Sequence, residues 1–368
     1  MEDRNITDAD RECPKQVDYN ERVKPMKDLK AFQPGENIGK LWKVVRAIDA
    51  EKGFNTIYVA ENTKNKKMAA IKIERKNEPI EILKFEVFVL LKVEQMKKSK
   101  QFCKLYEKGN ETDYNWIAIT LCGKNLRALR KRLPGGKLSL CCGLSVAQQC
   151  LKGIEEVHRL GFIHRNIAPS TFAIGNYNGK NPEELRNVYI LDFGFSHQYV
   201  KPDGKLKLPS VNPWKYVGSL RHMPRTAYSH VEFSRMEDME MWFYMTVELI
   251  KGCLPWAHLK DMKEVFEYQK ACRNGLPMRE LLGGLPAEFV EIMRAIDKLS
   301  FKIEPNYSEI YGWLNNAILF SGKSEFPYDW EEMEIEEFKN PPKPVEKKGE
   351  DKKGEEKKTE EKKTEEKK

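Results

Sequence analysis

Four short segments of the chain hold charged and polar side chains that could bind or act on a ligand. They are Ala70-Ile71-Lys72, Glu86 14 residues after that lysine, His164-Arg165-Asn166 and Asp192-Phe193-Gly194. A lysine ammonium attracts anions as a point charge, and carboxylates attract cations. The segments form one site only if the fold brings them to one place.

Each segment also has an ordinary explanation. A lone lysine on a strand is usually a solvated surface charge, and a glutamate on a helix is usually exposed. Asp-Phe-Gly is a common tripeptide, and His164 follows Phe162-Ile163, which is also the pattern of a core histidine. Only the four segments together, in this order and on suitable elements, form a specific signal.

The secondary structure that must position these residues changes once along the chain, from mainly strands to mainly helices. Residues 41–120 contain short runs rich in β-branched and aromatic residues, which predict strands at Trp42–Ile48, Thr56–Ala60, Met68–Ile73 and Trp116–Leu121. Apolar residues at helical spacing predict one helix between these strands, around Glu81–Gln95. Lys72 therefore lies on the third predicted strand, and Glu86 lies on the helix.

Helices are predicted from residue 139 onward. Ser139 is suited to cap a helix whose apolar stripe runs from Ala147 to Val157 and which Gly161 closes. Met239–Ile250 is apolar nearly all round, which predicts a helix buried on every side. The expected fold is α+β, with a small β-rich lobe followed by a larger helical lobe. Ligands favour the cleft between two such lobes.

The composition narrows the class of protein. The 368 residues carry a formal charge of +8, and 33% of them are charged. This charge is mild and mixed with acidic residues, so it predicts neither a nucleic-acid nor a membrane surface. No stretch reaches the ~18 uninterrupted apolar residues that a membrane span needs, and residues 1–15 lack the apolar core of a signal peptide.

The cysteines indicate the cellular compartment in which the protein is expected. There are eight of them, without a C-x-x-C pair, which predicts reduced and mostly buried thiols. We therefore expect an intracellular, cytoplasmic protein, and the lysine-rich C-terminal tail leaves nuclear entry open.

The four segments, in this order, resemble the motifs of protein kinases. In that family the lysine of the third strand holds the α- and β-phosphates of ATP, a helix acid pairs with it, and the aspartate of D-F-G binds magnesium. The resemblance gives these roles to Lys72, Glu86 and Asp192 and implies a bilobal kinase fold with ATP and Mg²⁺ as cofactors. It places the nucleotide against a further set of positions: Ile48, Gly53, Ala70, Ile119 and Leu121.

The flanking residues resemble the casein kinase 1 group. Gly161-Phe162-Ile163-His164-Arg165 and Phe172-Ala173-Ile174-Gly175 follow that group's catalytic-loop pattern, and Gly218-Ser219-Leu220-Arg221 resembles its G-T-x-R. Gly123-Lys124-Asn125-Leu126 looks closest to the tau-tubulin kinase branch. The resemblance extends over about residues 40–315.

This resemblance implies further roles. Asp238 is expected to brace the backbone of the catalytic loop, and Arg221 to hold an anionic group of a substrate. Lys215, Arg225 and Arg235 could extend this basic patch, although a solvated basic face is the commoner explanation. We interpret a second basic run as surface: Arg127, Arg130, Lys131 and Arg132. Phe193 and His164 are expected to pack in the core.

The sequence departs from the family at three positions of the catalytic loop. Asn166 stands where the family has an aspartate that accepts or orients the proton of the substrate hydroxyl, and loss of general-base help costs ~10²–10⁴ in rate. Ala168 replaces the lysine that faces the γ-phosphate, and losing one such charge stabiliser costs roughly 10²–10³. Thr171 replaces the asparagine that ligates the second magnesium, and its hydroxyl is a shorter and weaker oxygen donor.

The phosphate loop departs from the family as well. Kinases use several glycines there, so that backbone N–H groups approach the phosphates. The corresponding stretch Asp49–Asn55 retains only Gly53, and Asp49 and Glu51 would repel phosphate.

These patterns divide the chain into five parts. We expect an N-terminal extension (1–35), a kinase N-lobe (36–122), a kinase C-lobe (123–325), a C-terminal extension (326–340) and a disordered tail (341–368). The tail holds repeated lysines and glutamates and cannot bury a core.

Three functional hypotheses follow. The first is a pseudokinase that binds a protein partner, with nucleotide binding left open. The alternative is an active ATP- and Mg²⁺-dependent Ser/Thr kinase that phosphorylates intracellular proteins. The third is an interaction protein whose tail, residues 343–368, recruits the partner by itself. The sequence gives no oligomeric state.

Overall fold

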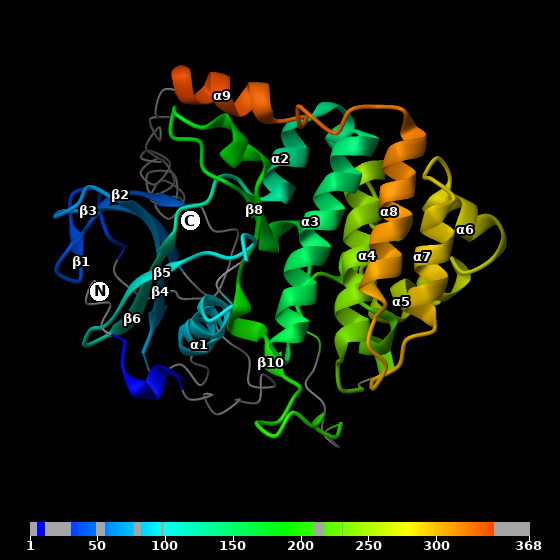
Figure 1. Cartoon of the computed structure of the whole chain (residues 1–368), viewed down its shortest axis with the longest axis horizontal. Helices are drawn as coiled ribbons and strands as arrows, with labels where there is room; N and C mark the ends of the chain where they lie inside the picture. Colours follow the sequence, from blue (N-terminus) through cyan, green and yellow to red (C-terminus); the bar gives the residue numbers. More distant parts are fainter. Residues whose placement is uncertain are drawn as a thin grey trace, which may run out of the picture.

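The computed structural model describes residues 6–11, 31–48, 56–76, 82–96, 99–209, 216, 218–229 and 231–341. These residues form a β-rich lobe, which lies on the left in Figure 1, and a helical lobe beside it. The expected α+β fold and the order of its two lobes are confirmed.

The N-lobe sheet has six antiparallel strands in the order β1-β2-β3-β4-β6-β5. Their bounds are β1 Asn37–Ile38, β2 Trp42–Ile48, β3 Thr56–Asn62, β4 Met68–Arg75, β5 Leu105–Asn110 and β6 Tyr114–Thr120. The sequence predicted β2, β3, β4 and β6. It missed β1, which is two residues long, and β5, whose charged and glycine residues have low strand propensity.

Lys72 reaches the cleft because side chains alternate between the two faces of β4. Ala69, Ile71 and Ile73 point into a core that belongs to the sheet alone. Ala70 points to the opposite face, whose core continues into the helical lobe. Lys72 shares that second face, which is covered by α1 (Ile82–Glu94), the helix predicted around Glu81–Gln95.

The C-lobe is built around two long helices, α3 (Leu140–Arg159) and α4 (Arg235–Lys251). Every residue of α4 is buried except Met236 and Lys251, so the prediction of a helix buried on all sides is confirmed. The indole of Trp242 donates a hydrogen bond to the carbonyl of Ala147, 3.0 Å away, which locks α4 to α3.

The other helices surround this pair. They are α2 (Leu126–Arg132), α5 (Met262–Ala271), α6 (Gly275–Leu282), α7 (Glu288–Asp297), α8 (Tyr307–Ser321) and α9 (Glu331–Lys339). Helix α8 packs along α3, and α9 lies across the end of the lobe near α2 (Figure 1).

Four short strands hold the loops that face the cleft. Strands β8 (Phe172–Ile174) and β9 (Val188–Ile190) form an antiparallel hairpin, and β7 (Phe162–Ile163) pairs with β10 (His197–Gln198). Residues 164–171 connect β7 to β8, and Asp192 follows β9 after one residue. The hairpin therefore brings the loop and the aspartate to the same side of the lobe.

The terminal extensions carry structure of their own. Asp10 in a 3₁₀ helix (Asp8–Arg11) forms an ion pair with Lys108 of β5, at 2.6 Å. Helix α9 lies within the part predicted as a C-terminal extension. The predicted tail, apart from Pro341, lies outside the described residues. None of the helices in the described ranges is long and apolar enough to span a membrane.

Candidate active site

Three charged residues from three elements meet in the cleft. Lys72 Nζ lies 2.7 Å from Glu86 Oε1 on α1 and 2.5 Å from Asp192 Oδ1 after β9. Lys72 and Glu86 are buried, while the side chain of Asp192 is 41% exposed. The pairing of Lys72 with Glu86 that the resemblance implied is therefore present, and Asp192 joins it.

The electrostatics of this group follow from its burial. Burial favours the neutral amine, but the charges of Asp192 and Glu86 outweigh it and raise the pKa of Lys72. Burial together with the charge of Asp192 raises the pKa of Glu86 against the opposing effect of Lys72. One ammonium faces two carboxylates, and Glu86 Oε2 is buried without a hydrogen-bond partner. Since Glu86 is buried, Asp192 is the carboxylate of this group that a further cation could reach.

Asp192 is held by its neighbours in sequence. Its backbone is left-handed (φ 66°), and the next residue, Phe193, is buried between the rings of Phe102 and His164. A Cβ at Gly194 would lie 1.8 Å from the side chain of Ile82, so only glycine fits there. The Asp-Phe-Gly segment is thus fixed by packing, with the aspartate pointing at Lys72.

His164 supports the same segment and has no role as a base. Its Nε2 donates to the carbonyl of Leu191 at 2.8 Å, and its Nδ1 accepts from the N–H of Asn166 at 3.3 Å. Burial lowers the pKa of this histidine, which favours the neutral ring. His164 and Phe193 pack in the core, as predicted.

Asp238 on α4 braces the loop between β7 and β8. Its carboxylate accepts hydrogen bonds from the N–H of His164 (2.6 Å), the N–H of Arg165 (2.8 Å) and Nε2 of His158 (2.8 Å). Burial works against the charged form, but these bonds and the charge of His158 outweigh it and lower the pKa of Asp238. Arg165 has a positive φ of 69°, a strained backbone that the brace holds in place. The role expected for Asp238 is confirmed by these contacts.

The hydroxyl of Thr171 is used inside the loop. Oγ1 lies 2.9 Å from the carbonyl oxygens of both Asn166 and Ala168, and it accepts from the N–H of Ala168 at 3.1 Å. Thr171 is only 2% exposed. A hydroxyl that is buried and already bonded to the backbone does not fit a metal site.

Comparison with known proteins agrees with this geometry. A protein kinase domain family model matches residues 52–287, which is more than half of the chain. The chain belongs to the protein kinase domain family. The match begins at Lys52, so it includes β3, β4, α1 and most of the C-lobe.

Individual relatives are also kinases by name. The serine/threonine-protein kinase spe-6 of Caenorhabditis elegans is 32% identical over 298 residues, 80% of this chain and 76% of that protein. A protein named a probable serine/threonine-protein kinase of Dictyostelium discoideum is 31% identical over 301 residues, 82% of this chain. The chain spans 58% of the length of that relative. Casein kinase I homolog 1 of Schizosaccharomyces pombe is 28% identical over 303 residues, 80% of this chain and 66% of the relative.

Within this kinase domain the magnesium ligands fit only in part. Asp192 offers an accessible carboxylate beside Lys72, and this is the residue that would hold a metal bound to nucleotide phosphates. Thr171, the position of the second ligand, does not fit. In the described ranges, no group of three or more His, Cys, Asp or Glu side chains forms another metal site.

The positions predicted to contact a nucleotide that the structure describes lie on the interior strands β2, β4 and β6 and just after β6. Ala70 of β4 pairs with Ile119 of β6, and Leu121 follows at the start of the link to the C-lobe. Ile48 is the last residue of β2 and is half-buried. Gly53 and the acidic stretch around it lie outside the described residues.

The predicted basic patch is divided among several acidic partners. Arg221 Nη1 lies 2.7 Å from Glu248 Oε1 on α4. Arg225 and Arg235 are bound elsewhere, to Glu240 and to the carbonyl of Lys302. Lys215 lies outside the described residues. Arg221 is thus paired with a carboxylate that it shares with Arg130 and His222.

The interpretation of Arg130 as surface is wrong. Arg130 is 8% exposed, and its Nη2 lies 2.8 Å from Glu248. His222 bonds the same carboxylate at 2.8 Å. Burial works against the charged form of Glu248. The bonds and charges of His222, Arg130 and Arg221 outweigh burial and lower the pKa of Glu248 to about 2. Arg130 belongs to a basic run but is buried, because it pairs with the buried carboxylate of Glu248, 118 residues further along the chain.

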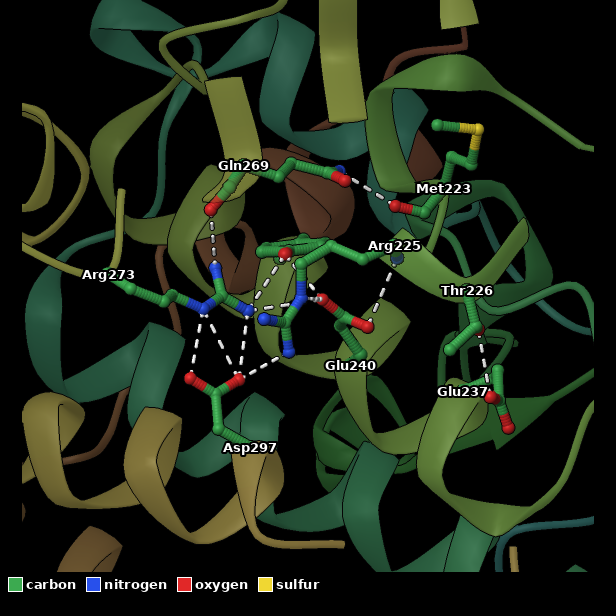
Figure 2. A network of polar contacts seen from close by, with 9 residues as sticks. Met223, Arg225, Thr226, Glu237, Glu240, Gln269, Arg273 and Asp297 are labelled. Carbon is green, nitrogen blue, oxygen red and sulfur yellow. Dashed lines mark hydrogen bonds and ion pairs between the residues drawn. The ribbon is translucent and has the colours of Figure 1, made fainter. Parts of the chain in front are cut away.

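Sequence reasoning also missed a second network on α4, shown in Figure 2. Glu240 accepts from Arg225 (2.6 Å), Arg273 (3.1 Å) and the hydroxyl of Tyr244 (2.6 Å), and both arginines also reach Asp297. The signal was available in the sequence, because acidic residues on a helix buried on all sides require cationic partners.

Proposed function

We propose that this chain is a kinase-like protein of the casein kinase 1 group in which phosphoryl transfer is impaired, and that it acts by binding a protein partner. The observation that carries this proposal is the composition of the loop His164–Thr171, which contains neither a carboxylate nor a lysine. Asn166 supplies an amide at the base position, and Ala168 supplies a methyl group where the family has a cation. The identity of Gly123-Lys124-Asn125-Leu126 favours the tau-tubulin kinase branch.

The expected rate follows from these losses. Kinases turn over at roughly 1–100 s⁻¹. Loss of a general base costs ~10²–10⁴ and loss of a charge stabiliser roughly 10²–10³, although such effects do not simply multiply. Even when only part of these two rate losses applies, turnover falls below about 10⁻² s⁻¹ by these magnitudes. This is too slow for phosphorylation to be the main activity.

Nucleotide binding is part of the proposal. In this proposal Lys72, held by Glu86 and Asp192, binds nucleotide phosphates, and Asp192 holds one Mg²⁺; the ion pairs that bring these three residues together support it. The metal would neutralise phosphate charge when bound. Thr171 provides no second metal site, so we expect one metal at most.

The experiment is a transfer assay with purified protein, labelled ATP and an acidic peptide. We expect incorporation no greater than that of the Lys72→Met and Asp192→Ala variants. Incorporation at an ordinary kinase rate that both substitutions abolish would overturn the proposal. A thermal-shift titration with ATP, with and without MgCl₂, tests binding separately. Binding at 100 times the Kd raises the stability by ~2.7 kcal/mol.

The intact group of Lys72, Glu86 and Asp192 supports a second candidate, an active Ser/Thr kinase acting on proteins. Much of phosphoryl transfer is positioning and electrostatics, which these residues supply. The same assay decides between the two candidates.

A further inference from the structure

Helix α9 is attached at both of its ends. Trp330, just before the helix, is fully buried, and its indole donates to the carbonyl of Leu185 at 2.9 Å. Phe338, near the other end, packs against the ring of Tyr177 with centroids 5.0 Å apart. A Cβ at Gly179 would lie 2.7 Å from the Phe338 ring, so the loop between β8 and β9 approaches the helix closely.

One side of α9 neutralises two cations, Lys124 of the link between the lobes and Arg132 at the end of α2. Lys124 Nζ lies 2.7 Å from Glu334 and 3.1 Å from Glu337, and Arg132 of α2 lies 2.8 Å from Glu334 and 2.5 Å from Glu337. Burial works against ionisation, but hydrogen bonds and charges from Lys124 and Arg132 outweigh it and lower the pKa of Glu337. Two carboxylates and two cations thus form one closed network.

The first residue of α9 holds a different segment. Arg186 Nε and Nη2 bind the two oxygens of Glu331, at 2.9 and 3.1 Å. Arg186 ends the 3₁₀ helix Pro182–Arg186, which connects β8 to β9. Glu331 also accepts from the N–H of Tyr328 at 2.7 Å. The helix therefore holds the interlobe link through Glu334 and Glu337, and the β8–β9 connection through Glu331.

Both held segments continue directly into the active site. The N–H of Gly123 bonds the carbonyl of Ile174 at 2.8 Å, and the N–H of Ile174 bonds the carbonyl of Lys124 at 3.1 Å. The hairpin of β8 and β9 begins after Thr171 and ends before Asp192. The N–H of Leu191 bonds the carbonyl of Thr171 at 2.9 Å. One hydrogen-bonded unit thus joins the link, the hairpin and the metal-binding aspartate.

We propose that α9 is a positioning element for the nucleotide site. Its glutamates hold the interlobe link and the β8–β9 hairpin in register, and this register aims Asp192 at Lys72. The effect on nucleotide affinity rests on the proposed nucleotide binding, whereas the effect on the hairpin does not.

The test compares two double variants of the full chain that remove the same charge from the same helix. Glu334→Gln/Glu337→Gln removes the carboxylates that face Lys124 and Arg132. Glu332→Gln/Glu336→Gln is the matched control, since Glu332 is exposed and, among the residues that the structure describes, the side chain of Glu336 bonds only Asn340 at the end of its own helix. We measure amide hydrogen exchange at residues 172–174 and 188–192 and the affinity for ATP by titration.

We expect the first variant to exchange the hairpin amides about tenfold faster than wild type, with α4 amides unchanged, and the control to match wild type. ATP affinity should fall about threefold or more in the first variant only. Reversing the charges on both sides, with Lys124→Glu/Arg132→Glu added to Glu334→Lys/Glu337→Lys, should restore protection.

Three outcomes would overturn the proposal. They are unchanged hairpin exchange in Glu334→Gln/Glu337→Gln, equal acceleration in the control, or acceleration that includes the α4 amides and so reports global destabilisation. If wild type shows no ATP binding while the hairpin responds as expected, the positioning of the hairpin stands and the proposed nucleotide binding fails.

Discussion

The two sides of the cleft differ in what they retain. On the N-lobe side, Lys72 keeps its partner Glu86 and also reaches Asp192 of the C-lobe, both within hydrogen-bond distance. On the C-lobe side, the loop His164–Thr171 keeps the brace from Asp238 but has no carboxylate of its own. The proposed function therefore treats the support of the loop and its chemistry as separable: the contacts that hold the loop are present, and the side chains proposed to act on substrate are the ones that differ from the family.

The largest expected effect concerns the brace. Asp238→Ala leaves the N–H groups of His164 and Arg165 and the ring of His158 without their buried acceptor, and should cost about 3–5 kcal/mol of unfolding free energy. Asp261→Ala is the control, because Asp261 caps α5 at the surface and its loss should cost about 1 kcal/mol. Urea denaturation measures both. Equal losses would show that the loop does not depend on Asp238.

The pH dependence of the unfolding free energy also tests the contribution of Asp238. Since the pKa of Asp238 in the folded chain lies below its usual value, its contribution is fully present above the unfolded pKa of about 4 and is lost as the pH falls through the folded value. Asp238→Asn has no carboxylate to titrate. The stability difference between wild type and Asp238→Asn should therefore shrink below about pH 4. A constant difference between pH 7 and pH 3 would contradict this account.

The next largest loss of stability is expected at the buried pair of Lys72 and Glu86. Lys72→Met leaves Glu86 buried without its cation and should cost roughly 3 kcal/mol. Adding Glu86→Gln to it should recover part of this loss, since the uncompensated charge is removed. A double-mutant cycle by urea denaturation should give a coupling of at least about 1 kcal/mol. Additive losses would mean that the pair is not coupled.

A smaller effect separates the structural role of Thr171 from a metal role. Thr171→Val removes the hydroxyl from the loop carbonyls and should cost about 1–2 kcal/mol. Thr171→Ser keeps the hydroxyl and should cost less than half of that. Thermal unfolding without metal measures both variants. If Val and Ser behave alike, the hydroxyl does not hold the loop.

Much of the framework could be predicted from the sequence because its signals are local. The apolar spacing of α1 predicted a helix there, and the all-round apolar character of α4 predicted its burial. The β-rich run of β4 predicted the strand that carries Lys72, whereas its place in the cleft came from the resemblance to kinases. The pairing of Lys72 with Glu86 and the brace from Asp238 came from the resemblance to kinases. Each of these features depends on a pattern within one element or on a known motif.

The long-range charge pairs could not be predicted in this way. Arg130 looked exposed because its neighbours are basic, and only the fold shows that Glu248 is its partner. Lys124 and Glu334 are 210 residues apart, and no periodicity connects them. Ion pairs of this kind are set by which elements pack together, which a local pattern does not encode.

The most direct test of the central claim is to restore the loop chemistry on its intact support. The variant Asn166→Asp/Ala168→Lys/Thr171→Asn should transfer labelled phosphate at least about 10² times faster than wild type. Restoration should stay incomplete, because the sequence predicts that Asp49 and Glu51 repel phosphate. The account predicts a wild-type rate below about 10⁻² s⁻¹ in the same experiment. A folded repaired variant no faster than wild type, or a wild type that already turns over at roughly 1–100 s⁻¹, would contradict it.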